Sequence, residues 1–176
     1  MKIKVQSFSP NPVELCAKAS YISHSEKKIT EIFEGNAPKD PFAYLTKIVK
    51  MGHLSVLEHA YFNLLAEDAP AVFEIFAIRF RLASFTVKSR RYTNVLKDGF
   101  FKTQNTLDEG FLEKVTQFYE KLKANDIPLE DARFILPYSF KTNMILSLNA
   151  RELGYMLYTA LYENNVPEIK EIAKFI

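Results

Sequence analysis

Hydrophobic and polar residues alternate at residues 2–8, and the stretches 61–67 and 142–148 also have the character of strands. Alternation with a period of two is typical of a strand with one face toward the core. A shorter candidate strand lies at 99–102, followed by a turn at 105–108. The pattern therefore predicts a small sheet whose strands are widely separated along the chain.

Between these strands, apolar residues recur every three or four positions, as on a helix with one buried face. Several of these stretches begin with a capping residue or a proline, which are start signals for helices. A further capping pattern at 55–58 is long enough for only a turn or two. Helices are expected from Asn11-Pro12 to Ile22, from Ser25 to Gly35, from Asp40-Pro41 to Gly52, from Ala69-Pro70 to Phe80, from 112 to Asn125, from Pro128 to Pro137, from Asn149 to Tyr162 and from Pro167 to Phe175.

Helices interspersed with a few strands, joined by short connections, favour an α+β fold with a mostly antiparallel sheet packed by helices. The length of 176 residues and the absence of a Gly- or Ser-rich linker indicate a single domain over 1–176. The expected helix at 70–80 is apolar around most of its circumference, which is typical of a buried helix, here also suited to a subunit interface.

Composition narrows the class of protein further. The hydrophobic content of 48% is ample for a core, and the net charge of +2 is too small for a general polyanion-binding surface. The single cysteine, Cys16, excludes an intrachain disulfide and fits a reducing compartment. With no signal peptide or membrane-spanning stretch, we expect a cytoplasmic protein. Three histidines without a clustered ligand motif predict no metal site.

The strongest local signal is the basic segment, residues 79–92, which lies in an interval without acidic residues between Glu74 and Asp98. Its arginines and hydroxyl groups are the donors that phosphate oxygens accept best. Three anions suit such a segment: the phosphates of a bound ligand, a nucleic-acid backbone, or carboxylates from elsewhere in the fold. The nearly neutral net charge argues against nucleic acid.

Four parts of the sequence resemble, in the same order, motifs of the flavin-dependent thymidylate synthases. They are Gly52-His53-Leu-Ser55-Val-Leu-Glu58-His59, Arg79-Phe80-Arg81 with Ser89 and Arg91-Tyr92 after it, Ala132-Arg133-Phe-Ile-Leu136-Pro137, and Asn149-Ala150-Arg151. Together they extend over roughly residues 10–160. The resemblance implies a homotetramer that converts dUMP to dTMP, with FAD as cofactor, methylenetetrahydrofolate as carbon donor and NADPH as reductant, at sites between subunits.

The resemblance also assigns roles to individual residues. Arg79 and Arg81 would hold FAD phosphates, and His53 would stand near the flavin ring. Ser55, Asn149 and Arg151 would contact the flavin nucleotide. The residues expected at dUMP are Ser89, the backbone around Arg90, and Arg91 and Arg133 at its phosphate; Ser89 is also the one catalytic candidate.

The sequence departs from the family pattern at several positions. Phe80 replaces the central histidine of the Arg-His-Arg motif, Phe76 replaces a glutamine, and Tyr155 replaces an asparagine. Counted without gaps from Asn149, the arginine that polarises the uracil ring falls on Ala160. We therefore keep two alternatives to the full enzyme: a catalytically impaired relative that binds FAD or a nucleotide, and a nucleic-acid-binding module.

Overall fold

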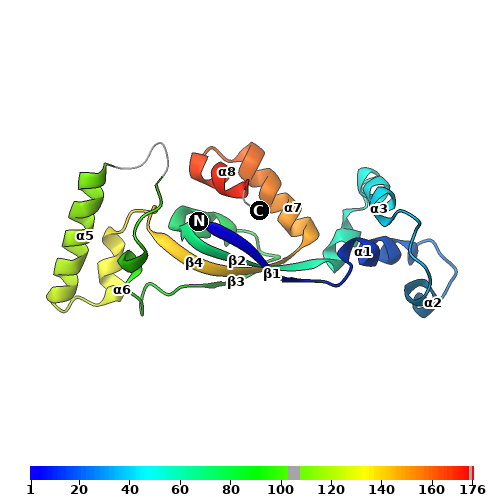
Figure 1. Cartoon of the computed structure of the whole chain (residues 1–176), viewed down its shortest axis with the longest axis horizontal. Helices are drawn as coiled ribbons and strands as arrows, with labels where there is room; N and C mark the ends of the chain where they lie inside the picture. Colours follow the sequence, from blue (N-terminus) through cyan, green and yellow to red (C-terminus); the bar gives the residue numbers. More distant parts are fainter. Residues whose placement is uncertain (103–107, 175) are drawn as a thin grey trace.

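Four antiparallel strands form the centre of the computed structural model, which describes residues 1–102, 108–174 and 176 (Figure 1). Their order across the sheet is β1-β2-β4-β3, so the two central strands, β2 and β4, are far apart in sequence. The strands are β1 (Lys2–Phe8), β2 (Tyr61–Pro70), β3 (Ser84–Val87) and β4 (Lys141–Asn149). The expected α+β class with an antiparallel sheet is confirmed.

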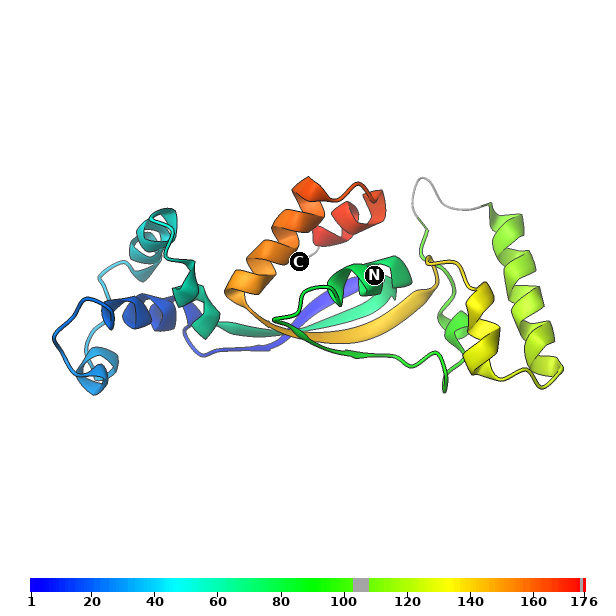
Figure 2. The ribbon, with the colours of Figure 1, turned by 180° about the vertical axis from the view of Figure 1, so that it is seen from behind.

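Helices cover one face of this sheet. Alternate residues of β4, among them Met144, Leu146 and Leu148, are buried, whereas Asn143 and Ile145 between them are only partly covered. The buried set faces the helices α4 (Ala71–Ala77), α7 (Ala150–Tyr158) and α8 (Pro167–Ala173), which lie on the same side of the sheet in both views (Figures 1 and 2). Each large apolar side chain buried there contributes about 1.5–3 kcal/mol.

Two helical regions extend from opposite ends of the sheet, which gives the molecule its elongated shape (Figure 2). One contains α1 (Pro12–Tyr21), α2 (Ile29–Glu34), α3 (Pro41–Lys50) and the 3₁₀ turn η1 (Leu54–His59). The other contains η2 (Val95–Asp98), α5 (Glu109–Ala124), α6 (Leu129–Ala132) and η3 (Arg133–Ile135).

Each region has a small core of its own. The first is built around Cys16, Leu45 and Ala60, so Cys16 is a buried core residue, as its apolar neighbours in the sequence predict. The second surrounds Tyr119 and Phe140. Burial raises the pKa of the Cys16 thiol, which keeps it protonated and unreactive at neutral pH.

One predicted helix start is wrong, and at another the predicted start is correct but its side-chain cap is absent. Asn11 precedes α1 but adopts a left-handed conformation, with φ 45°, and its side chain makes no cap hydrogen bond. An N-cap normally has an extended backbone, which directs its side chain toward the first turn. α2 begins at Ile29 rather than after Ser25, because the Ser25 hydroxyl accepts a hydrogen bond from the Lys27 N–H in a local turn.

The segment around the basic residues also differs from the expectation. Pro70 still belongs to β2, opposite Lys141, so α4 is shorter than predicted and ends at Ala77. Residues 84–87, predicted as part of a loop, are the edge strand β3. The strand expected at 99–102 is a single bridge between Phe100 and Phe140. The turn expected at 105–108 falls largely on residues outside the described ranges.

The helix predicted from Asn149 to Tyr162 changes its geometry before its end. α7 is α-helical only to Tyr158 and continues as a π-helical turn, η4 (Thr159–Glu163). Such a turn rotates all later side chains relative to a regular helix. Ala160 lies in this turn and is buried in the main core.

Candidate functional site

The structure supplies carboxylate partners for three cations of the basic segment or its edge. Lys88 pairs with Asp98, the Arg90 guanidinium donates to Glu74 at 2.7 Å, and the Arg91 Nε lies 3.1 Å from Glu130. None of these acids lies within the segment itself. The carboxylates that the sequence left as one alternative therefore account for these three side chains in the isolated chain.

Arg79 and Arg81 behave differently. Both are exposed, and neither guanidinium forms an ion pair or a hydrogen bond with any residue that the structure describes. Phe80 between them is buried, with its ring edge-on to Tyr155 of α7 at 5.6 Å between centroids. The aromatic contact anchors the segment against α7 and leaves the two flanking arginines in solvent. They are the cations best placed to receive an external anion.

The residues predicted to hold the cofactor gather near the beginning of α7, and we call them the α7 cluster: His53, Ser55, Arg79, Arg81, Asn149 and Arg151. The turn η1 reaches this helix through a backbone hydrogen bond from Ala150 to Ala60, 2.8 Å long, and an ion pair between Arg151 and Glu58 at 2.5 Å. The segment after Phe80 reaches it through the Leu82 N–H, which donates to Glu152.

Within the α7 cluster, Asn149 has a structural task. Its side-chain oxygen accepts a hydrogen bond from the Glu152 N–H at 2.8 Å, which caps α7 as the sequence predicts. The residue is 5% exposed, so it presents little surface to a ligand from within this chain. His53 and Ser55, in contrast, are exposed on η1.

The residues predicted to bind the nucleotide substrate lie elsewhere, and we call them the α6 cluster: Ser89, Arg90, Arg91 and Arg133. Glu130 of α6 joins two of them, because its carboxylate pairs with Arg91 and its backbone oxygen accepts a hydrogen bond from the Arg133 Nε at 2.8 Å. The Arg133 guanidinium also lies over the ring of Phe134. Glu130 thus brings two arginines together, one at its carboxylate and one at its backbone oxygen.

Ser89 organises a turn after β3. Its hydroxyl accepts a hydrogen bond from the Arg91 N–H at 3.2 Å, and its backbone oxygen accepts from both the N–H and the hydroxyl of Thr93. Activation of a serine requires a hydrogen-bonded base. No such base contacts Ser89 in the described part of the chain, so its hydroxyl is suited to binding an anion.

The two clusters lie at opposite ends of β4. The α7 cluster adjoins Asn149 at the end of the strand, while Lys88, next to Ser89, donates its N–H to the oxygen of Asn143 near the beginning. Asn149 and Asn143 are six residues apart on this strand, a distance of about 20 Å. The two clusters are therefore separated along the sheet within one chain.

The acidic partners of these clusters were not identified from the sequence. Glu58 and Glu130 lie within or beside the motifs quoted above, which is the only local signal for them. Glu74 is buried, and this burial raises its pKa above the ordinary value, although the charge of Arg90 acts in the opposite direction. Its pairing depends on chain segments that meet only in the folded protein.

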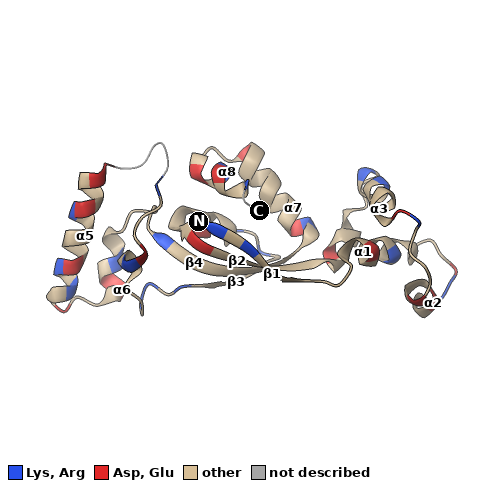
Figure 3. Cartoon of the chain, viewed as in Figure 1, with Lys and Arg blue, Asp and Glu red and all other residues tan. Residues whose placement is uncertain are grey.

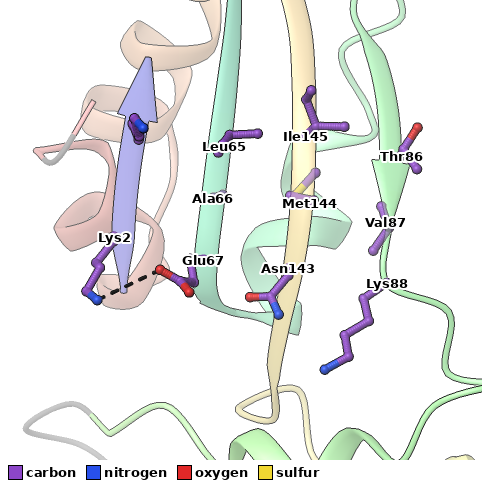
Figure 4. Close-up of a pocket in the computed structure, with 11 residues that line it drawn as sticks. Lys2, Leu65, Ala66, Glu67, Thr86, Val87, Lys88, Asn143, Met144 and Ile145 are labelled. Carbon is purple, nitrogen blue, oxygen red and sulfur yellow. Dashed lines mark ion pairs between the residues drawn. The ribbon is translucent and has the colours of Figure 1, made fainter. Parts of the chain in front are cut away.

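A shallow groove of about 600 Å³ lies on the sheet face that the helices leave open (Figure 4). Its floor is apolar, with Leu65 and Ile145, and lysines stand at its rim, one of which, Lys2, pairs with Glu67. None of the residues in the two clusters lines this groove. It is a surface feature separate from the predicted site.

Other features of the described chain limit its chemistry. Among the described residues, no helix has the length and apolarity needed to cross a membrane, and no group of three His, Cys, Asp or Glu side chains could hold a metal ion. Lysines and arginines alternate with acids along α5 and in the region of α1 (Figure 3). With three of the segment's cations already paired, this distribution does not favour a polyanion surface.

The fold matches solved structures of nucleotide-modifying proteins. A thymidylate synthase X from Helicobacter pylori, solved with FAD and dUMP, superposes with a TM-score of 0.76 over 99% of this chain and 90% of its own, at 22% identity. A UMP/dUMP methylase, PolB, from Streptomyces cacaoi matches with a TM-score of 0.75 over 98% and 86%, at 17% identity. These likenesses define the class of fold.

Sequence comparison defines the family. The profile described as "Thymidylate synthase complementing protein" matches residues 4–176. The flavin-dependent thymidylate synthase of Pyrococcus horikoshii is 35% identical over 98% of this chain and 76% of the relative, and that of Geobacter sulfurreducens is 31% identical over 98% and 79%. The chain belongs to the flavin-dependent thymidylate synthase family.

Proposed function

We propose that this chain is a flavin-dependent thymidylate synthase that methylates dUMP reductively to dTMP, with methylenetetrahydrofolate as carbon donor and NADPH as reductant. The observation that supports it most is the family match over residues 4–176, together with two arginines of the family's cofactor motif that have no partner among the described residues. The chain's residues bind and orient the reactants; the flavin supplies the hydride transfer.

The α7 cluster fits the proposed cofactor, FAD. A diphosphate needs several charge-assisted donors, and the free guanidinium groups of Arg79 and Arg81 provide them. His53 and Ser55 are exposed beside the same helix and would contact the rest of the cofactor. Asn149 and Arg151 would support it indirectly, since the first caps α7 and the second is paired with Glu58.

The α6 cluster fits dUMP. Arg91 and Arg133 would take its phosphate, and the backbone N–H groups around Arg90 together with the Ser89 hydroxyl would complete the set of donors. The phosphate must displace the Glu130 carboxylate from Arg91. A dianionic phosphate is favoured in this exchange because it carries more charge than the carboxylate it replaces.

We infer further that the working site is assembled between copies of the chain, as in the homotetramer that the family resemblance implies. The separation of the two clusters along β4, about 20 Å, supports an arrangement in which one copy holds the flavin and another brings dUMP to it. The uncovered sheet face and its apolar groove offer surface for contacts between copies.

A second candidate, a relative that binds FAD and nucleotide without making dTMP, is favoured by one specific observation. Between Arg151 and Lys170 the chain contains no lysine or arginine, so the part of α7 after Arg151 and η4 supply no cation to polarise uracil. Loss of a positioned charge of this kind costs a factor of about 100 or more in rate. The buried position of Ala160 also means that an arginine placed there would point into the core.

Release of tritium from C5-labelled dUMP separates the candidates. A purified protein that shows flavin absorbance and releases tritium with reduced FAD and methylenetetrahydrofolate is the synthase. Binding of FAD and dUMP without release of tritium indicates the inactive relative. A colourless protein that takes up no added FAD would contradict both.

A further inference from the structure

Among the described residues, Glu74 and Arg90 form the most buried ion pair. Arg90 belongs to the α6 cluster. The distance from the Arg90 Nη2 to the Glu74 Oε1 is 2.7 Å, with the side chains 28% and 5% exposed. Glu74 belongs to α4, on the helix-covered side of the sheet, while Arg90 follows the edge strand β3. The pair therefore ties the basic segment to the main body of the protein.

A second contact holds the same guanidinium. Arg90 lies over the ring of Phe140, 5.5 Å from its centroid, and Phe140 is buried at the beginning of β4. The backbone oxygen of Phe140 accepts a hydrogen bond from Ala71, the first residue of α4. Glu74 and Phe140 thus belong to one rigid unit, and Arg90 is clamped between a carboxylate and an aromatic face.

The inward direction of Arg90 fixes the direction of its neighbours. Ser89 and Thr93 close a turn around it, and the Arg91 side chain, 54% exposed, points to α6 and Glu130. In this turn the Arg90 side chain is directed to buried Glu74, whereas the Arg91 side chain is exposed. When Arg90 is anchored in the protein, Arg91 and the Ser89 hydroxyl are presented outward together.

We propose that Glu74 and Arg90 are positioning residues, a latch that holds the segment 89–91 in the conformation that receives the phosphate of the nucleotide. This rests on the proposed binding of dUMP by the α6 cluster. Arg90 then acts through its backbone and its anchor, not through a guanidinium contact with the substrate. Preorganisation of this kind lowers the entropy that binding would otherwise cost.

The test is the double variant Glu74→Met/Arg90→Met. Replacing both partners of a buried pair by apolar residues of similar volume is often close to neutral for stability, whereas removing one leaves an uncompensated charge. We expect a thermal midpoint near that of the parent, unchanged FAD binding, and dUMP affinity lowered about tenfold or more. The matched control is Glu14→Gln/Lys18→Met, which removes a similarly short and partly buried pair in α1.

Hydrogen exchange of the same proteins, measured without dUMP, tests the latch independently of ligand binding. The latch predicts faster exchange of the amides of residues 89–93 in the double variant and no change in the control. Faster exchange in the double variant, combined with a parent protein that binds no dUMP, would support the latch and refute the proposed function. Unchanged exchange, or parental dUMP affinity in the double variant, would overturn the latch.

Discussion

At the scale of single residues, the cations of the basic segment have different tasks because their partners differ. Arg79 and Arg81 have no anionic partner among the described residues, Arg91 has an exposed one and Arg90 a buried one. An exposed ion pair contributes about 0–1 kcal/mol, so a ligand can displace it. A buried pair resists displacement, because separating it leaves a charge in a medium that solvates it poorly.

Replacement of Glu130 by glutamine should tighten dUMP binding, because Arg91 then loses the carboxylate that competes with phosphate. We expect a decrease in the dissociation constant of about two- to fivefold, the size of an exposed pair. Titration calorimetry would measure it, with Asp131→Asn as control, since this change removes the same charge from the same helix. An equal gain in the control would show that net charge, not competition at Arg91, is responsible.

Glu74 should give the stability a distinctive pH dependence. Its folded-state pKa is raised by burial, so the folded protein binds the proton more tightly than the unfolded chain does. The free energy of unfolding of the parent, relative to Glu74→Gln, should therefore increase as the pH falls through the raised pKa toward the ordinary value of a glutamate. Urea denaturation at several pH values would measure this difference; a decrease over the same interval would contradict the prediction.

At the scale of elements, two asparagines that look alike in the sequence behave differently. Both Asn11 and Asn149 precede a helix with an acid three residues later, but only Asn149 caps its helix through its side chain. The difference lies in the backbone, which is left-handed at Asn11 and extended at Asn149. A capping pattern is thus sufficient to predict where a helix begins. It does not determine whether the capping side chain accepts a hydrogen bond from an N–H group of the first turn.

Substitution of Asn149 by alanine should destabilise the protein by about 1 kcal/mol, the usual contribution of a cap. Chemical denaturation would measure the loss. The control is Asn11→Gly, which should be neutral or slightly stabilising because glycine adopts the positive φ at that position without strain. Equal losses at the two positions would mean that the cap of α7 contributes nothing specific.

At the scale of the whole molecule, the separation of the α7 and α6 clusters is the feature with the largest functional consequence. It predicts complementation between subunits. Arg79→Ala/Arg81→Ala should lose FAD binding, and Arg91→Ala/Arg133→Ala should lose dUMP binding. After co-refolding in equal amounts, about one quarter of the sites should combine an intact cluster from each parent.

The dUMP-induced change in the flavin absorbance spectrum would report these restored sites, whether or not the protein makes dTMP. Each variant alone should show no such change, and the mixture should regain it. Co-refolding each variant with itself is the control. A mixture without any response would mean that both clusters of a working site belong to one chain.

The sequence by itself determined the α+β class, most helices and strands, the buried Cys16 and the family. These depend on periodicity and motifs over a few neighbouring residues, which local chemistry fixes. It did not reveal that residues 84–87 form an edge strand, since four residues among cations lack a clear period and acquire their pairing only from β4.

Only the tertiary structure decided which cations of the basic segment remain free and where the two clusters lie. Glu74, Glu130 and Asp98 reach the segment from other elements, and ion pairs between distant positions leave no local trace in a sequence. The π-helical turn at Thr159–Glu163 likewise changes which face Ala160 occupies. The segment 79–92 is therefore recognisable as an anion site from its composition, but its division into free, displaceable and anchored cations follows from long-range packing.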